Sequence, residues 1–96
     1  MTKSSLRRKF SQFIGSGYKL KVTVAFGRVL RRLRQERGLS QETVGELANL
    51  QRKYISLLER ADYQPKLDTV FRLAEALEYS PSNLIALVEE EASKDL

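Results

Sequence analysis

Apolar residues recur at the spacing of an amphipathic helix through almost the whole chain from residue 24 onward. Residues typical of turns and helix caps separate the successive helical segments, and no segment after residue 25 has the alternation of a β-strand. The pattern predicts five helices, over residues 24–37, 40–48, 51–60, 67–78 and 80–90. Since 96 residues make one domain with a modest core, we expect an all-α fold.

The expected helix ends carry residues that suit them. Ser40 and Ser80 are good N-caps, and Pro81 would occupy the first helical position of the last helix. Gly38 stands where a left-handed C-terminal cap is expected, and Asn49 tolerates the same conformation. A tight turn should therefore separate the second predicted helix from the third.

The predicted domain spans residues 24–90, preceded by a basic extension (1–23) and followed by an acidic tail (91–96). Within the extension, residues 6–14 place four apolar side chains on one face of a short helix, and residues 18–24 alternate as an extended segment would. The core should be built from apolar positions three or four residues apart. These positions are Leu30, Leu33, Val44, Leu47, Ala48, Ile55, Leu58, Val70, Phe71, Leu73, Ala74, Leu77, Leu84, Ile85, Leu87 and Val88.

Charge is distributed unevenly along the chain. Residues 1–38 contain eleven Lys or Arg and one acid, whereas residues 39–96 contain six Lys or Arg and eleven acids, and the balances of +10 and −5 sum to the net charge of +5. This asymmetry favours a polyanionic partner for one face of the protein. The basic extension could lie along DNA, dock on a second subunit or another protein, or serve only as a solubilising tail.

Composition excludes several classes of function. The chain has no Cys and no His, which removes disulfides, thiol chemistry, the usual zinc sites and the commonest general base. No pair of acids stands out from a solvated surface, so we expect neither an enzyme nor a metal or other cofactor. No apolar run approaches membrane-spanning length and no secretory signal is visible, so we expect a cytoplasmic protein that does not bind membranes.

The segment "NLQRKYISLLER", residues 49–60, places two cations at the wrong end of a helix. Arg52 and Lys53 fall in its first turn, where the helix dipole is already positive and a cation costs about 0.3–1 kcal/mol. With the preceding helix, "SQETVGELANLQRKYISLLE" has the spacing of a helix-turn-helix. Gly45 in mid-helix costs about 1 kcal/mol relative to Ala and predicts that another backbone packs closely there. An ordinary helical hairpin is the alternative.

The segments "FGRVLRRLRQERGLSQETVGELA", "YISLLER" and "LAEALEYSPSNL" resemble the phage-repressor and Cro-like helix-turn-helix family, often called the XRE family. The resemblance covers about residues 26–88 and implies a five-helix DNA-binding domain. Members of this family are sequence-specific transcriptional regulators, often repressors and commonly dimeric. The third helix would be the recognition helix, which lies in the major groove with its N-terminal residues at base edges.

The resemblance assigns roles to individual residues. The candidate base contacts are Gln51, Arg52, Lys53, Ser56 and Leu57. The candidate contacts to the DNA backbone are Gln41, Tyr54, Arg60 and Lys66. Gln41 would also brace the recognition helix, Leu57 could instead be partly buried, and Arg60 and Lys66 could be ordinary surface charges.

Other positions concern the fold and its assembly. Arg34 and Glu59 match a family ion pair that ties the first helix to the third, so their role should be structural. Ala61 and Glu78 stand where the family often has Gly, and we therefore expect the loops after the third and fourth helices to differ in shape. The candidate dimer surface is the last helix, through Leu84, Ile85, Leu87 and Val88.

The leading hypothesis is a homodimer that reads a palindromic operator in double-stranded DNA, with half-sites about 10–10.5 base pairs apart. One alternative is an antitoxin or other protein-binding module that uses residues 1–21, with or without DNA binding. Another is non-specific compaction of nucleic acid.

Overall fold

The computed structural model describes residues 21–94, and every expectation that concerns residues 1–20 or 95–96 lies outside the described part of the chain. The described residues form the helices α2 (Val22–Glu36), α3 (Gln41–Ala48), α4 (Arg52–Glu59), α5 (Leu67–Ala76) and α6 (Pro81–Ser93), with no strand between them. The predicted all-α class with five helices is confirmed. None of these helices has the length and apolar character that crossing a membrane requires.

The N-terminal caps form as predicted at two helices. The Ser40 hydroxyl accepts a hydrogen bond from the backbone N–H of Thr43 at 3.0 Å, and that of Ser80 accepts one from the backbone N–H of Asn83 at 3.1 Å. Pro81 occupies the first turn of α6. Each cap satisfies a backbone donor that the helix itself leaves unpaired.

Helices α2 to α5 all end in the same kind of turn. The left-handed residue of each turn is Gly38, Asn49, Ala61 or Glu78, with φ values of 67°, 57°, 62° and 62°. In each turn the next backbone N–H donates to a carbonyl five residues earlier, as Leu50 does to Gly45 at 2.7 Å and Tyr79 to Ala74 at 2.8 Å. The expectation that the loops at Ala61 and Glu78 differ in shape is wrong. Their hydrogen bonds, and at Tyr79 the packing of the ring against the core, outweigh the cost of a left-handed side-chain-bearing residue.

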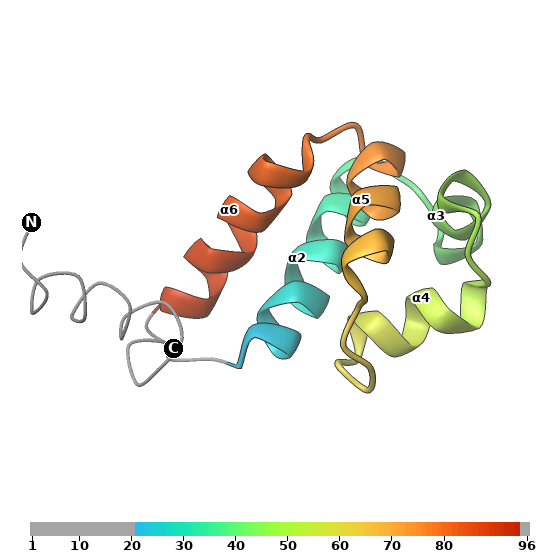
Figure 1. The fold of residues 1–96 in the computed structure, drawn as a ribbon. Helices are drawn as coiled ribbons and strands as arrows, with labels where there is room; N and C mark the ends of the chain where they lie inside the picture. The colour runs from blue at the N-terminus through green and yellow to red at the C-terminus, as the bar shows by residue number, and fades with distance from the viewer. Residues whose placement is uncertain (1–20, 95–96) are drawn as a thin grey trace, which may run out of the picture.

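The helices pack around one core. Helix α2 lies against α6 on one side and α4 on the other, and α3 lies against both α4 and α5 (Figure 1). All five helices contribute to the largest fully buried side chains, and α3 contributes Val44. In Figure 1, α3 and α4 lie at one side of the molecule and α6 at the opposite side.

The folded unit extends beyond the predicted limits at both ends. Helix α2 begins at Val22, so the extended conformation expected for residues 18–24 is wrong over its last three residues. Helix α6 continues to Ser93, past the predicted end at residue 90. Its Glu91 is buried against α2, where Arg32 donates a hydrogen bond to the carboxylate at 2.9 Å. Residues 91–93 therefore belong to α6, because Glu91 takes part in the packing between α2 and α6.

Hydrogen bonding from Arg32 holds the pKa of Glu91 below its ordinary value. Burial opposes this effect, and Lys94, with its Nζ 3.3 Å from the carboxylate, reinforces it. Arg28 contributes a fourth charge, 3.9 Å away. The ion-pair cluster thus favours the ionised carboxylate and joins the first and last helices of the described chain.

Some predicted core positions are exposed. Leu47 on α3, Phe71 on α5 and Ile85 on α6 face solvent, whereas Leu87 is half-buried against the core. Short helices of a small domain bury one narrow stripe each, and these three residues lie just beside the buried stripe. Prediction from spacing alone was therefore wrong for them.

Candidate nucleic-acid interface

Helix α4 is anchored by its inner face and presents its outer face to solvent. Ile55 and Leu58 are fully buried, while Arg52 and Lys53 are exposed. Side chains on the outer face surround a hollow of about 350 Å³. The residues that line it are Arg52, Lys53, Ser56, Leu57 and Arg60. The structure thus brings together four of the five candidate base contacts and one candidate backbone contact.

Gln51 lies at the N-terminal edge of this surface. It is the N-cap residue of α4 with an extended backbone, and its side chain makes no capping hydrogen bond. Its carbonyl accepts from the N–H groups of Tyr54 and Ile55, at 3.0 and 3.2 Å. The exposed Gln51 side chain is therefore not needed for the helix end and remains available to a ligand.

The first turn of α4 is positively charged without compensation from its own sequence. It contains no acidic residue, and its first two positions are Arg52 and Lys53. The positive end of the helix dipole adds to these charges. A polyanion would relieve the repulsion, because duplex DNA carries one negative charge per roughly 1.7 Å of its axis.

A buried carboxylate fixes the far end of α4. The guanidinium of Arg34 donates to Glu59 through Nε at 2.6 Å and through Nη2 at 3.0 Å, and its Nη1 donates to the carbonyl of Leu39 at 2.9 Å. Gln41 donates its Nε2 hydrogen to the same Glu59 carboxylate at 3.1 Å. The ion pair that the sequence predicted is thus present, and it joins α2, the α2–α3 turn, α3 and α4.

This arrangement stabilises charges that would otherwise be costly in the interior. Hydrogen bonding to Glu59 raises the pKa of Arg34 above its ordinary value, against the opposing effect of burial. Two parallel N–H···O bonds also fix the relative orientation of the two side chains. Arg34, Gln41 and Glu59 therefore set the angle at which α4 is presented.

Two glycines permit the close approach of α4 to its neighbours. A Cβ atom at Gly45 would lie 2.6 Å from the carbonyl oxygen of Leu50, so the close backbone predicted there belongs to the turn between α3 and α4. A Cβ atom at Gly27 would lie 2.6 Å from the carbonyl oxygen of Leu58 and 2.7 Å from that of Glu59. The sequence analysis missed Gly27, although a glycine in mid-helix is the signal that identified Gly45.

Three candidate backbone contacts lie outside the hollow. The side chain of Gln41 is directed to Glu59 and braces α4, as expected of that residue. Tyr54 is half-buried against the core, with its ring centroid 6.4 Å from that of Tyr63. Lys66 is exposed at the N-cap of α5.

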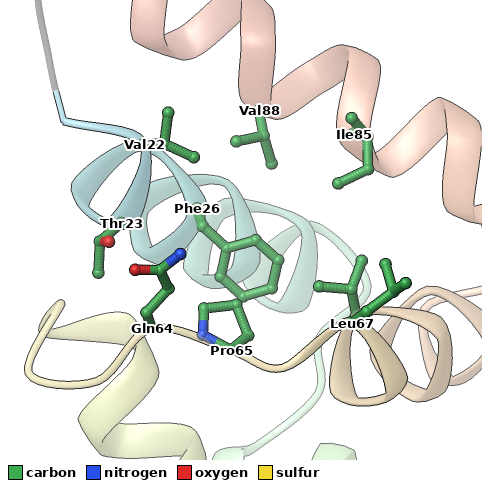
Figure 2. Close-up of a pocket in the computed structure, with 9 residues that line it drawn as sticks. Val22, Thr23, Phe26, Gln64, Pro65, Leu67, Ile85 and Val88 are labelled. Carbon is green, nitrogen blue, oxygen red and sulfur yellow. The ribbon is translucent and has the colours of Figure 1, made fainter. Parts of the chain in front are cut away.

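The predicted dimer surface needs correction. Leu84 and Val88 are 1% and 4% exposed and belong to the protein's own core, so they offer almost no surface to a second subunit. Ile85 is exposed beside a second hollow, of about 250 Å³ and mainly apolar (Figure 2). In Figure 2, Val22, Leu67 and Ile85 surround Phe26 and Pro65 at this site. Residues 21–94 contain no group of acids that could hold a metal ion.

Comparison with known proteins agrees with this geometry. The sequence profile of the helix-turn-helix family matches residues 30–84, more than half of the chain. An uncharacterized HTH-type transcriptional regulator of Sinorhizobium fredii, y4dJ, is 39% identical over 59 residues, which are 62% of this chain and 77% of that protein. The immunity repressor protein of Bacillus phage phi105 is 35% identical over 71 residues, 71% of this chain and 49% of that protein.

Two solved structures extend the comparison. The restriction-modification controller protein C.AhdI of Aeromonas hydrophila is 42% identical with a TM-score of 0.63, over 65% of this chain and 94% of that chain. The controller protein C.Esp1396I, solved as a tetramer in complex with its natural 35 base-pair operator, is 25% identical with a TM-score of 0.72, over 79% of this chain and 100% of that chain. The chain therefore belongs to the helix-turn-helix family of phage-repressor-like (XRE) DNA-binding transcriptional regulators.

Proposed function

We propose that this protein recognises a specific operator sequence by placing α4 in the major groove of duplex DNA. The observation that carries the proposal is the exposed, positively charged N-terminal turn of α4, held in place by Glu59 at the helix's other end. The operator complex of the related controller protein C.Esp1396I supports it. We also propose a cytoplasmic location, which is consistent with a DNA partner.

The side chains of the hollow suit this role chemically. An arginine that donates two hydrogen bonds to guanine discriminates against other bases by about 1–3 kcal/mol, and Arg52 is the exposed arginine nearest the helix start. Gln51 and Lys53 flank it, and Ser56 lies one turn further along. The half-buried Leu57 can contact a thymine methyl group.

We further propose that two copies bind a palindromic operator together. Three apolar side chains gather near the α5–α6 boundary, with exposed fractions of 72% for Leu67, 53% for Phe71 and 46% for Ile85. Phe71 lies one turn beyond Leu67 on the same face of α5. A two-fold interface uses the same surface on both copies, and we propose that this exposed apolar surface takes that role in place of the buried pair Leu84 and Val88.

Selection of bound DNA from a random pool tests the operator proposal. We expect an enriched palindrome with half-sites about 10–10.5 base pairs apart. Arg52→Ala should lose preference at one base position in each half-site, whereas Lys94→Ala, the same charge change at the end of α6, should keep it. Equal loss of affinity for every duplex in the Arg52 variant would indicate non-specific binding instead.

The dimer is tested by sedimentation equilibrium. Phe71→Glu should shift the protein toward the monomer and weaken binding to the palindrome, because it places a charge in the apolar surface. Leu47→Glu, an equally polar change at an exposed apolar residue of α3, should leave the oligomeric state unchanged. A dimer that survives Phe71→Glu would place the contact elsewhere.

Protein binding through residues 1–21 is a second candidate function. The observation that favours it is the position of Val22, which lines the apolar hollow directly after that segment. Copurification of one tightly bound protein, lost when residues 1–21 are deleted, would support this function. Purification without any such partner would count against this function.

A further inference from the structure

The three cations around the hollow on α4 are not in equivalent surroundings. Among the described residues, Arg52 and Lys53 pair with no carboxylate, whereas the Nη2 atom of Arg60 lies 2.9 Å from Oδ2 of Asp62. Both partners of this pair are more than half exposed. Such a pair adds little to the stability of the fold, so its significance lies in what it does to Arg60.

Asp62 is held in position by the backbone of the turn after α4. Ala61 has the left-handed conformation, with φ of 62°, and the N–H of Asp62 donates to the carbonyl of Leu57 at 2.9 Å. Arg60 is the C-cap of α4, and its N–H donates to the carbonyl of Ser56 at 3.1 Å. The two side chains therefore project from neighbouring points of a hydrogen-bonded turn, beside the hollow that Arg60 lines.

The pair changes both the charge and the geometry of Arg60. A cation that neutralises a phosphate releases counterions, which binds any duplex regardless of sequence. A guanidinium already paired with Asp62 contributes less of this general attraction. Its Nη2 atom is also directed toward Asp62, which leaves the other N–H donors for an acceptor on the opposite side of the guanidinium.

We propose that Asp62 is a specificity-determining residue that positions Arg60 and suppresses its attraction to arbitrary DNA. This role of Asp62 rests on the proposed operator recognition and determines how selective that recognition is. Asp62 makes Arg60 a directed hydrogen-bond donor toward a phosphate or base edge that the operator provides. Arg52 and Lys53, which pair with no carboxylate among the described residues, keep their full attraction to phosphates in addition to their proposed base contacts.

This role is tested by measuring the affinity of the full-length protein for two duplexes. One has the sequence selected from a random pool, and the other has a scrambled sequence of equal length. Asp62→Asn should bind the scrambled duplex several-fold more tightly and reduce the ratio of the two affinities. For the Asp62→Asn variant, the slope of log affinity against log salt concentration should become steeper by up to about 0.9, which is the contribution of one additional phosphate contact. Asp62→Glu, which keeps the charge, should retain most of the ratio.

Two controls separate positioning from a simple change of net charge. Glu89→Gln makes the same charge change on α6, at the opposite side of the molecule from α4, and should leave the ratio unchanged (Figure 1). In the Arg60→Ala background, Asp62→Asn should no longer alter the ratio, because the cation that Asp62 controls is gone. Thermal denaturation of each variant checks that the fold is retained.

The outcomes distinguish this inference from the proposal on which it rests. If wild-type protein enriches no sequence from the pool, operator recognition itself fails, and the role of Asp62 in selectivity fails with it. If wild-type protein is selective but Asp62→Asn changes both affinities by the same factor, only the role of Asp62 is overturned. An equal effect of Asp62→Asn with and without Arg60 would overturn it as well.

Discussion

Gly27 is the residue at which packing and helix propensity make opposite predictions. Alanine in a helix interior is favoured over glycine by about 1 kcal/mol, so propensity alone predicts that Gly27→Ala stabilises α2. The structure predicts the reverse. The new Cβ atom would lie 2.6 Å from the carbonyl oxygen of Leu58 and 2.7 Å from that of Glu59, closer than the 3.0 Å below which such contacts essentially never occur.

The magnitude follows from the movement required. To reach 3.0 Å from both oxygens, α2 and α4 must separate by about 0.4 Å, and about twice that to reach an ordinary contact of 3.4 Å. Both obstacles are backbone atoms, so no side chain can rotate away. Overpacking typically costs about 1–3 kcal/mol, and two backbone contacts below 3.0 Å place Gly27→Ala in the upper part of that range, at about 2–3 kcal/mol. After the gain of about 1 kcal/mol in propensity, we expect a net loss of about 1–2 kcal/mol.

Urea and thermal denaturation, followed by circular dichroism, measure the loss. For a domain of this size it corresponds to a fall of about 4–16 °C in Tm. Gln35→Ala, an exposed change on the same helix, should shift the free energy of unfolding by less than about 0.5 kcal/mol. Because Leu58 and Glu59 form the last turn of α4, DNA binding should weaken in the Gly27 variant even at temperatures where it is fully folded.

The sign of the change is the decisive result. A Gly27→Ala protein more stable than wild type by about 1 kcal/mol would show that α4 moves aside freely, and the close packing of α2 on α4 would then not orient the recognition surface. A loss confined to stability, with DNA affinity unchanged in the folded variant, would separate the fold from the interface.

Three further predictions concern stability. Glu59→Gln should lower the free energy of unfolding by about 3 kcal/mol in urea denaturation at pH 7, because it leaves the largely buried guanidinium of Arg34 without its anion. A loss below about 1 kcal/mol would contradict this prediction. Ala61→Gly and Glu78→Gly should each raise it by about 0.5–1 kcal/mol by relieving a left-handed conformation, and no gain at either site would show that the turns are unstrained. Glu91→Gln should lower Tm at pH 7. The difference in Tm from wild type should shrink as the pH falls below the ordinary pKa of 4.5 and through the lower pKa of Glu91 in the folded protein. Over that pH range Glu91 becomes protonated, and the stability that its ionised form contributes is lost. A difference in Tm that is constant with pH would contradict the role of this ion-pair cluster.

The helix order and most of the helix ends were predictable from the sequence. Ser40, Ser80, Pro81, Gly38 and Asn49 act on backbone groups within a few residues of themselves, so their effect can be predicted without knowledge of the rest of the fold. That most of the candidate base contacts would share one exposed surface was predictable for the same kind of reason. Four base-contact candidates lie on one outer face of a single short helix, whose periodicity is a local property.

Other features depended on partners far along the chain. Glu91 is helical and buried because Arg32, 59 residues earlier, donates to its carboxylate. Leu84 and Val88 belong to the core while Ile85 remains exposed, a choice that depends on how α6 meets α2 and α5. The spacing of apolar residues shows that a helix has a broad apolar face. It does not show which residues of that face are buried by neighbouring helices.

Local chemistry was therefore sufficient to define the helices, their caps and the charged outer face of α4, because each depends on interactions within one or two helical turns. Tertiary packing alone decided which apolar residues remain exposed and that Glu91 is buried beside Arg32, 59 residues earlier in the chain. It also decided the role of Gly27, because a residue without a side chain is required there only when the backbone of α4 packs against it. These features arise from surfaces that meet only in the folded chain, and no pattern along a single helix contains them.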